Sequence, residues 1–233
     1  MGALARVRHT LWLFRTLPSG ARRWFVLRLM EGQASRQRRL EAALGQQDAR
    51  LVFVCHGNIM RSAFAEHVAR AVVPHRAHDI ASSGTHAKTG REAEKTAQAT
   101  ARFLGYDLQS HRASSFRDIQ LATSDLIVCM DRDNEARVLQ FLGQGQRVFL
   151  VGDIDELQAA PGGSVNGAKD GAGHGPASAG GETHPDGEIE PLERDESREV
   201  PDPYGKGADV TGRAFLRLRS RGELWARRHF SHA

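Results

Sequence analysis

The chain has 233 residues, enough for one domain of ordinary size with additions and for a substantial buried core. Its two cysteines lie far apart, which excludes a disulfide framework and a paired-cysteine zinc site and is typical of a reducing compartment such as the cytoplasm. The net charge of +4 is small and unevenly spread, so it says little about partners, and no nucleic-acid partner is expected.

Residues 1–47 are predicted to form a basic amphipathic helical extension. Apolar residues recur near helical spacing, a Pro18-Ser19-Gly20 break follows, and a second apolar and basic run extends from Trp24 to Met30. No run reaches the roughly twenty apolar residues of a membrane span, and Arg15 leaves the first run too short for a secretory signal.

Three interpretations of this extension remain open. The first is an amphipathic helix on an anionic membrane surface, and the second is an Arg-rich organelle presequence. The third is a helical extension that is either docked on the domain or left as a tail. We favour the last. The expected localisation is cytoplasmic, with membrane association through the basic N-terminus as the alternative.

Residues 48–230 are predicted to form the main domain, in which strands alternate with helices. Strands are expected at 51–54, 79–82, 125–129 and 147–151. Helices are expected around Phe64, Val68 and Val72, over 92–104, over 134–141, and over about 210–229. This alternation predicts an α/β fold: a doubly wound, mainly four-stranded parallel sheet of flavodoxin-like topology with helices on both faces.

The helix and strand pattern stops at about residues 158–199. Gly, Ala, Ser, Pro and His dominate the first part of this segment, and Glu, Asp and Arg the second. Such a composition cannot bury enough apolar surface to order itself, so we predict a disordered low-complexity insertion. Its histidines, His174 and His184, lack metal-ligand spacing, and no metal is assigned to them.

The most informative run is Cys-His-Gly-Asn-Ile-Met-Arg-Ser, from Cys55 to Ser62, between the first strand and first helix of the domain. Backbone N–H groups at such a turn suit the oxygens of a tetrahedral oxyanion and stabilise a thiolate. Arg61 can hold two of those oxygens at once, and Ser62 can donate its hydroxyl to the Cys55 sulfur. Gly57 suits a tightly bent backbone, which often needs a positive φ or an absent Cβ. These residues predict a thiol that binds and attacks a phosphate group.

The run resembles the phosphate-binding loop of the low-molecular-weight protein tyrosine phosphatases. The resemblance extends, in the family's order, to Ser82–Thr85, Ser110–Ala113, Asp125–Asp131 and Pro201–Tyr204. It implies hydrolysis of phosphotyrosine through a phosphocysteine intermediate, with no cofactor and no metal. The implied partners are tyrosine-phosphorylated proteins, with an autophosphorylating tyrosine kinase as one candidate.

The resemblance also implies the roles of individual residues. Cys55 is the expected nucleophile, Arg61 the expected ligand of the phosphoryl oxygens, and Asp202, between two prolines, the expected general acid. His111 is expected to support the loop through Asn58. The expected substrate-binding residues are His56, Gly57, Asn58, Ile59, Met60, Ser62 and Tyr204, the last as part of an aromatic wall.

Two other functions remain open. Thiol-dependent arsenate reduction uses the same fold and loop, but its disulfide cascade needs two further cysteines. Cys129 lies near a plausible second position, whereas Ala136 stands about where a third thiol is expected, so an external thiol would have to substitute. A non-catalytic phosphoprotein-binding module predicts the loss of a catalytic residue, and none is lost. The retained Asp202 segment favours the phosphatase.

Overall fold

The computed structural model describes residues 11–157 and 198–231, apart from residues 13, 16, 18, 45, 47, 48, 144 and 146. Residues 1–10 and nearly all of the predicted insertion lie outside the described residues. In chain order the elements are α2 (Ser19–Met30), α3 (Gln33–Leu44), β1 (Leu51–Cys55), α4 (Arg61–Val72), η1 (Pro74–Asp79), β2 (Ile80–Gly84), α5 (Lys95–Phe103), β3 (Leu126–Cys129), α6 (Arg132–Leu142), β4 (Val148–Leu150), η2 (Val151–Leu157) and α7 (Ala208–His229).

Four parallel strands form the sheet, in the order β2-β1-β3-β4. The central strand β1 pairs with β2, with Cys55 opposite Gly84, and with β3, with Val54 opposite Cys129. Because β2 and β3 lie on opposite sides of β1, the strand order reverses next to the carboxyl end of β1. The predicted α/β fold with a four-stranded parallel sheet is confirmed.

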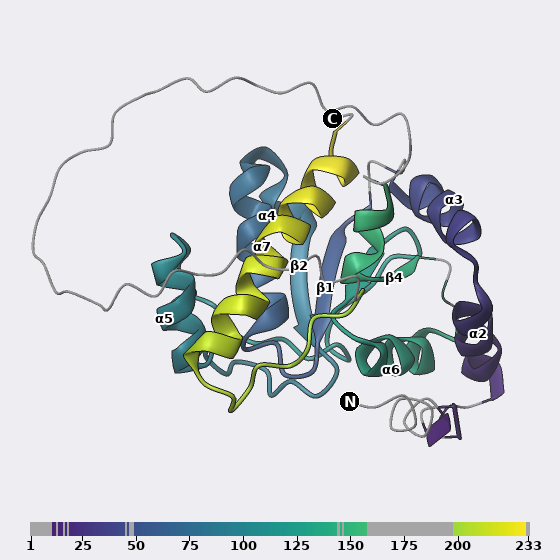
Figure 1. The fold of residues 1–233 in the computed structure, drawn as a ribbon, viewed down its shortest axis with the longest axis horizontal. Coiled ribbons are helices and arrows are strands. Elements are labelled where there is room, and N and C mark those ends of the chain that lie inside the picture. Colours follow the sequence, from purple (N-terminus) through teal and green to yellow (C-terminus); the bar gives the residue numbers. More distant parts are fainter. Residues whose placement is uncertain are drawn as a thin grey trace, which may run out of the picture.

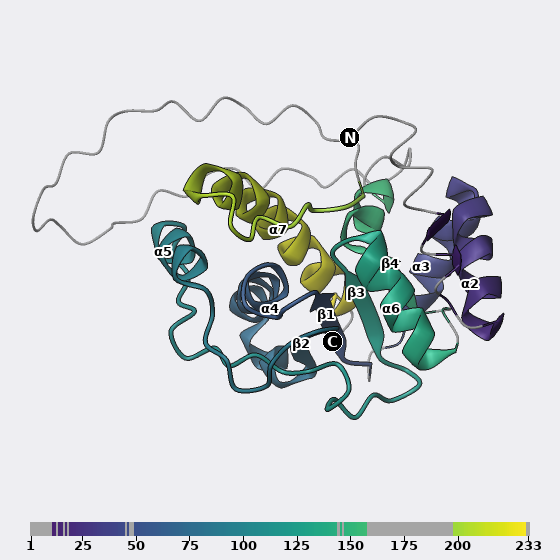
Figure 2. The same ribbon diagram turned by 90° about the horizontal axis from the view of Figure 1, so that it is seen from below.

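Helices cover both faces of this sheet (Figures 1 and 2). One core lies between the sheet and α4, α5 and α7, and the other lies between the sheet and α6, with α2 outside α6. Successive residues of a strand point to opposite faces. Phe53 and Cys55 therefore belong to the first core, whereas Val54 and Cys129 belong to the second.

Both N-terminal helices pack on the domain: α2 lies against α6, and α3 lies against η2 (Figure 1). Phe25 of α2 and Leu40 of α3 are fully buried. The guanidinium of Arg28 lies 3.6 Å from Glu135, and that of Arg36 lies 3.6 Å from Asp153. Part of the positive charge of this segment is thus used in contacts within the chain. No helix among the described residues is long and apolar enough to cross a membrane.

The observed elements differ from the prediction mainly at their ends. The first strand extends to Cys55. The helix expected from residue 92 begins at Lys95, because the Glu94 side chain accepts the N–H groups of Thr96 and Ala97 and so caps it. The last strand is shorter than predicted and continues directly into η2, which the sequence did not predict.

Candidate active site

The run singled out in the sequence lies at the carboxyl end of β1, next to the point where the strand order reverses. Cys55 ends β1, residues 56–60 form a loop, and α4 begins at Arg61. The helix N-cap is Met60, whose side chain makes no capping hydrogen bond. The first N–H groups of α4 therefore remain for another acceptor, such as an anion.

Peptide carbonyls of this loop are turned outward, toward neighbouring segments. The pairs are Cys55 O with Thr85 N at 3.0 Å, His56 O with His86 N at 2.8 Å, Asn58 O with His111 Nε2 at 2.7 Å, and Ile59 O with Glu94 N at 2.9 Å. In a trans peptide the following N–H points opposite to the carbonyl, and the described residues contain no cis peptide. The N–H groups of the next residues therefore point toward the inside of the loop. They belong to His56, Gly57, Ile59 and Met60.

Asn58 holds the loop in this shape. It is fully buried and takes a positive φ of 52°. Its side-chain Nδ2 donates to Ser62 Oγ at 3.0 Å and to Ser82 Oγ at 2.7 Å, and its Oδ1 accepts from Ser114 N at 2.7 Å. His111 contacts the backbone carbonyl of Asn58, and burial lowers the pKa of His111 although this hydrogen bond opposes the shift.

The glycine on which the loop depends is not the expected one. Gly57 has no positive φ, and a Cβ there would lie 3.4 Å from the Ile59 side chain, an ordinary contact. At Gly84 of β2, in contrast, a Cβ would lie 2.7 Å from the carbonyl oxygen of His56 and 2.8 Å from the N of Asn58. The expectation that Gly57 needs a special conformation is wrong, because Asn58 takes the left-handed conformation instead.

We expect Gly84→Ala to displace the loop backbone and to lower kcat/KM for an aryl phosphate by about tenfold or more. The added methyl group meets backbone atoms that cannot rotate away, and such overpacking costs about 1–3 kcal/mol. Steady-state kinetics and thermal unfolding measure the two effects. The matched control is Gly212→Ala in α7, where a Cβ meets nothing within 4 Å; it should retain activity. Equal activity of both variants would contradict the close approach of Gly84 to the loop backbone.

The Cys55 thiol lies at the base of the loop and is only 3% exposed. Its Sγ accepts from the backbone N of Asn58 at 3.2 Å and from the hydroxyl of Ser62 at 3.0 Å. Two donors aimed at one sulfur atom stabilise a thiolate. The side chains of Ile59 and Met60 are buried in the same core as Cys55, so these residues offer the loop their N–H groups only.

Arg61 connects the loop to two carboxylates. Its Nη1 donates to Asp131 Oδ2 at 2.6 Å and to the carbonyl of Val200 at 2.9 Å, and its Nη2 lies 3.1 Å from Asp202 Oδ2. Burial opposes the charge of the guanidinium, but Asp131, Cys55 and Asp202 outweigh it, and the pKa of Arg61 is raised. Nη1 therefore binds Asp131 and Val200, whereas Nη2 contacts the partly exposed carboxylate of Asp202.

Asp202 reaches the loop although it follows Cys55 by almost 150 residues. Val200 is held by hydrogen bonds from both sides, since its N donates to the carbonyl of Met130 at 2.8 Å and its carbonyl accepts from Arg61. The Asp202 side chain is 44% exposed, and its Oδ1 accepts from the backbone N of Tyr204 at 3.3 Å. Tyr204 itself is 55% exposed. Both side chains therefore lie at the open rim.

The described residues on either side of 158–197 meet at η2, which ends at Leu157 and contacts Arg198. Gly152 N donates to the carbonyl of Arg198 at 3.0 Å, and the Arg198 guanidinium lies 2.8 Å from Asp153. A Cβ at Gly152 would lie 2.6 Å from the Arg198 backbone. The chain thus returns beside the element that it left, so the length of the intervening segment does not displace Asp202.

His56 differs from the other loop residues because its side chain is exposed. Its ring stacks on His86, with ring centroids 4.4 Å apart. Burial first and the neighbouring His56 second lower the pKa of His86. Both side chains are exposed beside the loop.

Sequence reasoning missed several residues that complete the site. Asp131 binds Arg61 and also caps α6, because its Oδ1 accepts from Asn134 N at 2.8 Å. An Asp between a buried strand and a helix is a recognisable N-cap signal. No local signal marks Glu66, which contacts Ser82 and so supports Asn58 only in the folded chain.

The site and fold together define an α/β protein with a thiol at the base of an oxyanion-type loop. The sequence model of the family described as "Low molecular weight phosphotyrosine protein phosphatase" matches residues 50–165. Low molecular weight protein-tyrosine-phosphatase PtpB of Staphylococcus epidermidis is 32% identical over 122 residues, 50% of this chain and 84% of that protein. Low molecular weight protein-tyrosine phosphatase A of Mycobacterium tuberculosis is 37% identical over 111 residues, 45% of this chain and 66% of that protein.

This chain belongs to the low molecular weight protein-tyrosine phosphatase family, as the sequence resemblance implied. A solved structure agrees in fold. The crystal structure of the Erwinia amylovora tyrosine phosphatase AmsI aligns with a TM-score of 0.53 at 24% identity, over 78% of this chain and 93% of that chain.

Proposed function

We propose that the protein hydrolyses aryl phosphate monoesters, phosphotyrosine in proteins above all, through a phosphocysteine intermediate. The observation that supports this most strongly is the convergence of three groups on one loop. Cys55 Sγ has two hydrogen-bond donors, the loop amides point inward, and the Arg61 guanidinium lies between this loop and Asp202. Family membership supports the same reaction.

In the first step, Cys55 Sγ attacks phosphorus in line with the leaving oxygen, so that an S–P bond forms as the O–P bond breaks. The loop N–H groups and the Nε and Nη2 edge of Arg61 hold the equatorial oxygens while their charge redistributes. The phosphate draws Arg61 Nη2 away from Asp202, and the protonated Asp202 carboxyl gives its proton to the departing phenolate.

In the second step, water replaces the thiolate. The Asp202 carboxylate takes a proton from a water molecule, whose oxygen attacks phosphorus while the S–P bond breaks. Inorganic phosphate leaves, and Cys55 returns to the thiolate. The hydroxyl of Ser62, 3.0 Å from Sγ, stabilises the sulfur as negative charge returns to it.

Asp202 is the proposed acid, although Asp131 also contacts Arg61. Both oxygens of Asp131 already accept hydrogen bonds, from Asn134 N and from Arg61, and its side chain is 18% exposed. The Asp202 side chain is 44% exposed and lies at the rim, where a leaving group departs. We therefore assign Asp131 to the orientation of Arg61.

The position of Cys129 argues against arsenate reduction through an internal disulfide. Its side chain belongs to the core on the opposite face of the sheet from Cys55, and it is fully buried. Burial, together with Glu135 and Asp131, raises the pKa of this thiol well above its usual value. A disulfide with Cys55 would need the two side chains to meet through the sheet.

We expect Cys129→Ala to keep kcat/KM for p-nitrophenyl phosphate within about twofold of the parent, because the substitution removes one buried sulfur atom away from the loop. Phosphate release and arsenite formation with added thiols are measured in parallel. Phosphate release without arsenite supports the phosphatase. Arsenite formation that is lost in Cys129→Ala would replace it with the reductase, and inactivity in both assays would favour a phosphoprotein-binding module.

The proposed partners are tyrosine-phosphorylated proteins, with an autophosphorylating tyrosine kinase as one candidate. The exposed ring of Tyr204 at the rim supports a flat aromatic substrate. We place the protein in the cytoplasm, consistent with two free cysteines. Leu27, Leu29 and Met30 are exposed on α2, so peripheral contact with a membrane remains part of this proposal; vesicle co-sedimentation tests it.

A further inference from the structure

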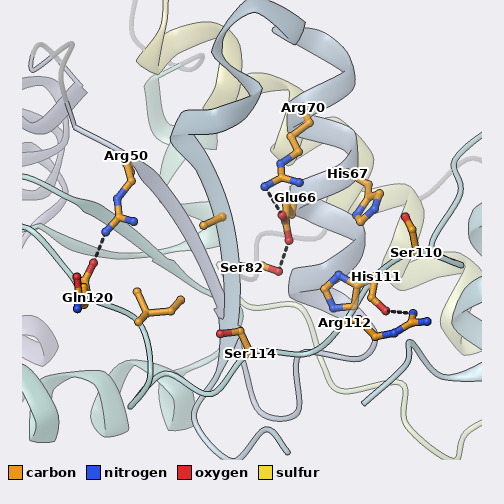
Figure 3. A pocket seen from close by; sticks show the side chains of 12 residues that line it. Arg50, Glu66, His67, Arg70, Ser82, Ser110, His111, Arg112, Ser114 and Gln120 are labelled. Atoms are coloured by element: carbon orange, nitrogen blue, oxygen red, sulfur yellow. Dashed lines mark hydrogen bonds and ion pairs between the residues drawn. The ribbon is translucent and has the colours of Figure 1, made fainter. Parts of the chain in front are cut away.

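A cavity of about 440 Å³ lies beside the phosphate-binding loop, on the outer side of the residues that support Asn58. Its walls come from α4, from β2 and from the segment 110–120 (Figure 3). Ser82, His111 and Ser114, which all contact Asn58, are among the lining residues. The cavity is therefore distinct from the mouth of the loop but shares residues with its support.

Three potential metal ligands gather in this cavity. Glu66 and His67 come from α4, and His111 comes from the segment before β3. One ligand atom from each lies within 4.8 Å of the others. The rings of His67 and His111 have centroids 5.8 Å apart, and Figure 3 shows both beside the Glu66 carboxylate.

Each imidazole is held by a backbone carbonyl through one nitrogen. His67 Nδ1 lies 2.9 Å from the carbonyl of Ala63, and His111 Nε2 lies 2.7 Å from that of Asn58. A carbonyl oxygen only accepts, so these two nitrogens carry the protons of the neutral rings. Nε2 of His67 and Nδ1 of His111 therefore keep free lone pairs. Histidines that bind metals are oriented in the same way, by donation of the other N–H to a carbonyl or carboxylate.

We propose that Glu66, His67 and His111 form a binding site for a divalent transition-metal cation of the Zn²⁺ type. Two imidazoles and one carboxylate are a ligand set that suits zinc and its neighbours. In a tetrahedral site with bonds of about 2.1 Å the ligand atoms lie about 3.4 Å apart, closer than the 4.8 Å within which one potential ligand atom of each residue lies here. His67 is only half-buried and on the helix surface, so its ring can make most of the movement needed.

The kinds of ligand in the cluster, two imidazoles and one carboxylate, favour such a cation over Mg²⁺ or Ca²⁺. Glu66 also accepts from Ser82 and lies 2.7 Å from Arg70 Nη2, but a carboxylate offers about four lone-pair positions, so capacity remains. Arg50 and Arg112 line the same cavity. Glu66 is the one carboxylate among the residues that line this cavity, whereas hard cations are usually held by several carboxylate and carbonyl oxygens.

The site is coupled to the phosphate-binding loop through the residues it shares with it. His111 holds the Asn58 carbonyl directly, and Glu66 holds Ser82, which accepts from Asn58 Nδ2. A cation bound by His111 and Glu66 thus contacts both supports of the residue that shapes the loop. This inference goes beyond the proposed phosphatase activity and does not depend on it. It departs from the expectation of no metal, since residues 66, 67 and 111 form no spacing motif.

Zn²⁺ binding to chelator-treated, full-length protein tests the proposal, in a Cys55→Ser background so that the active-site thiol does not bind the ion. Competition with a chromophoric chelator gives the stoichiometry and affinity. We expect His67→Ala to weaken the binding of one equivalent of Zn²⁺ by about tenfold or more, because it removes a direct ligand. Co²⁺ in place of Zn²⁺ should give the visible absorption of a low-symmetry site, and His67→Ala should abolish it.

The matched control is His75→Ala in η1, which removes an exposed histidine outside the cavity and should leave the affinity unchanged. His67→Gln, which retains side-chain volume, replaces His67→Ala if that variant unfolds, as judged by circular dichroism. With Cys55 restored, metal-free His67→Ala should keep the parent's phosphatase activity. Absence of Zn²⁺ binding in the Cys55→Ser protein, or equal affinity in the His67 variants and the parent, would overturn the proposal.

Discussion

Cys55→Ser is expected to lower kcat for p-nitrophenyl phosphate by at least about 10⁴-fold, the scale of loss seen when a nucleophile is removed. The loop aims two hydrogen-bond donors at the sulfur atom, Asn58 N and the Ser62 hydroxyl. A serine hydroxyl in the same place stays protonated near neutral pH and has no adjacent base to activate it. Steady-state phosphate release measures the effect.

The same variant should still fold and bind phosphate, because the inward N–H groups and Arg61 are unchanged. Thermal unfolding with and without phosphate checks both points. Cys129→Ala is the matched control, since it removes the other cysteine from the opposite face of the sheet. A normal rate in Cys55→Ser would falsify the phosphocysteine mechanism.

Asp202→Asn is expected to lower kcat by roughly 10²–10⁴-fold on phenyl phosphate, the range attributed to a general acid. The amide has nearly the same shape, and its oxygen can keep the 3.1 Å contact with Arg61 Nη2, but it has no acidic proton to give. The loss should shrink as the leaving phenol becomes more acidic, because such a phenolate departs without help. A series of substituted phenyl phosphates measures this dependence.

Two carboxylates serve as controls for this dependence. Asp155→Asn should keep full activity; its side chain is 47% exposed and is paired with Arg221 at 2.7 Å, much as Asp202 is paired with Arg61. Asp131→Asn should lower the rate by a similar factor for every leaving group, because Asp131 orients Arg61 and donates no proton. A leaving-group dependence in Asp131→Asn, and none in Asp202→Asn, would reverse the two assignments.

Local sequence determined most of the fold. Parallel strands buried on both faces are continuous apolar runs, and Leu51–Cys55 shows this directly. Gly105 and Gly143 both take a positive φ just after a helix, the conformation in which many helices end. The ends of the elements were predicted less well. The start of α5 depends on which polar side chain caps its first N–H groups. Glu94 is the N-cap, because its carboxylate accepts hydrogen bonds from two of these groups.

Contacts between distant segments were not predictable from local sequence. The sequence favoured an N-terminal extension that is docked on the domain or left as a tail, but it could not indicate that Arg28 and Arg36 approach acidic residues of α6 and η2. From the sequence, a positive φ or an absent Cβ was expected at Gly57, whereas Asn58 takes the positive φ and Gly84, on the neighbouring strand, makes the close approach. Such an approach depends on strand register, which no single segment encodes.

By itself, then, the sequence determined the chemistry of the loop. Cys55, Arg61 and Ser62 lie within seven residues of one another at a strand-to-helix turn, and a turn of that length brings thiol, guanidinium and hydroxyl together. Only the tertiary structure decided which distant groups complete the site. Asp131 approaches Arg61 because it follows β3, whose carboxyl end lies beside that of β1, and Asp202 does so because Val200 is hydrogen-bonded to Met130 and to Arg61. The same packing sets Cys129 on the opposite face and gathers Glu66, His67 and His111 in one cavity, arrangements that follow from strand register and helix docking rather than from spacing along the chain.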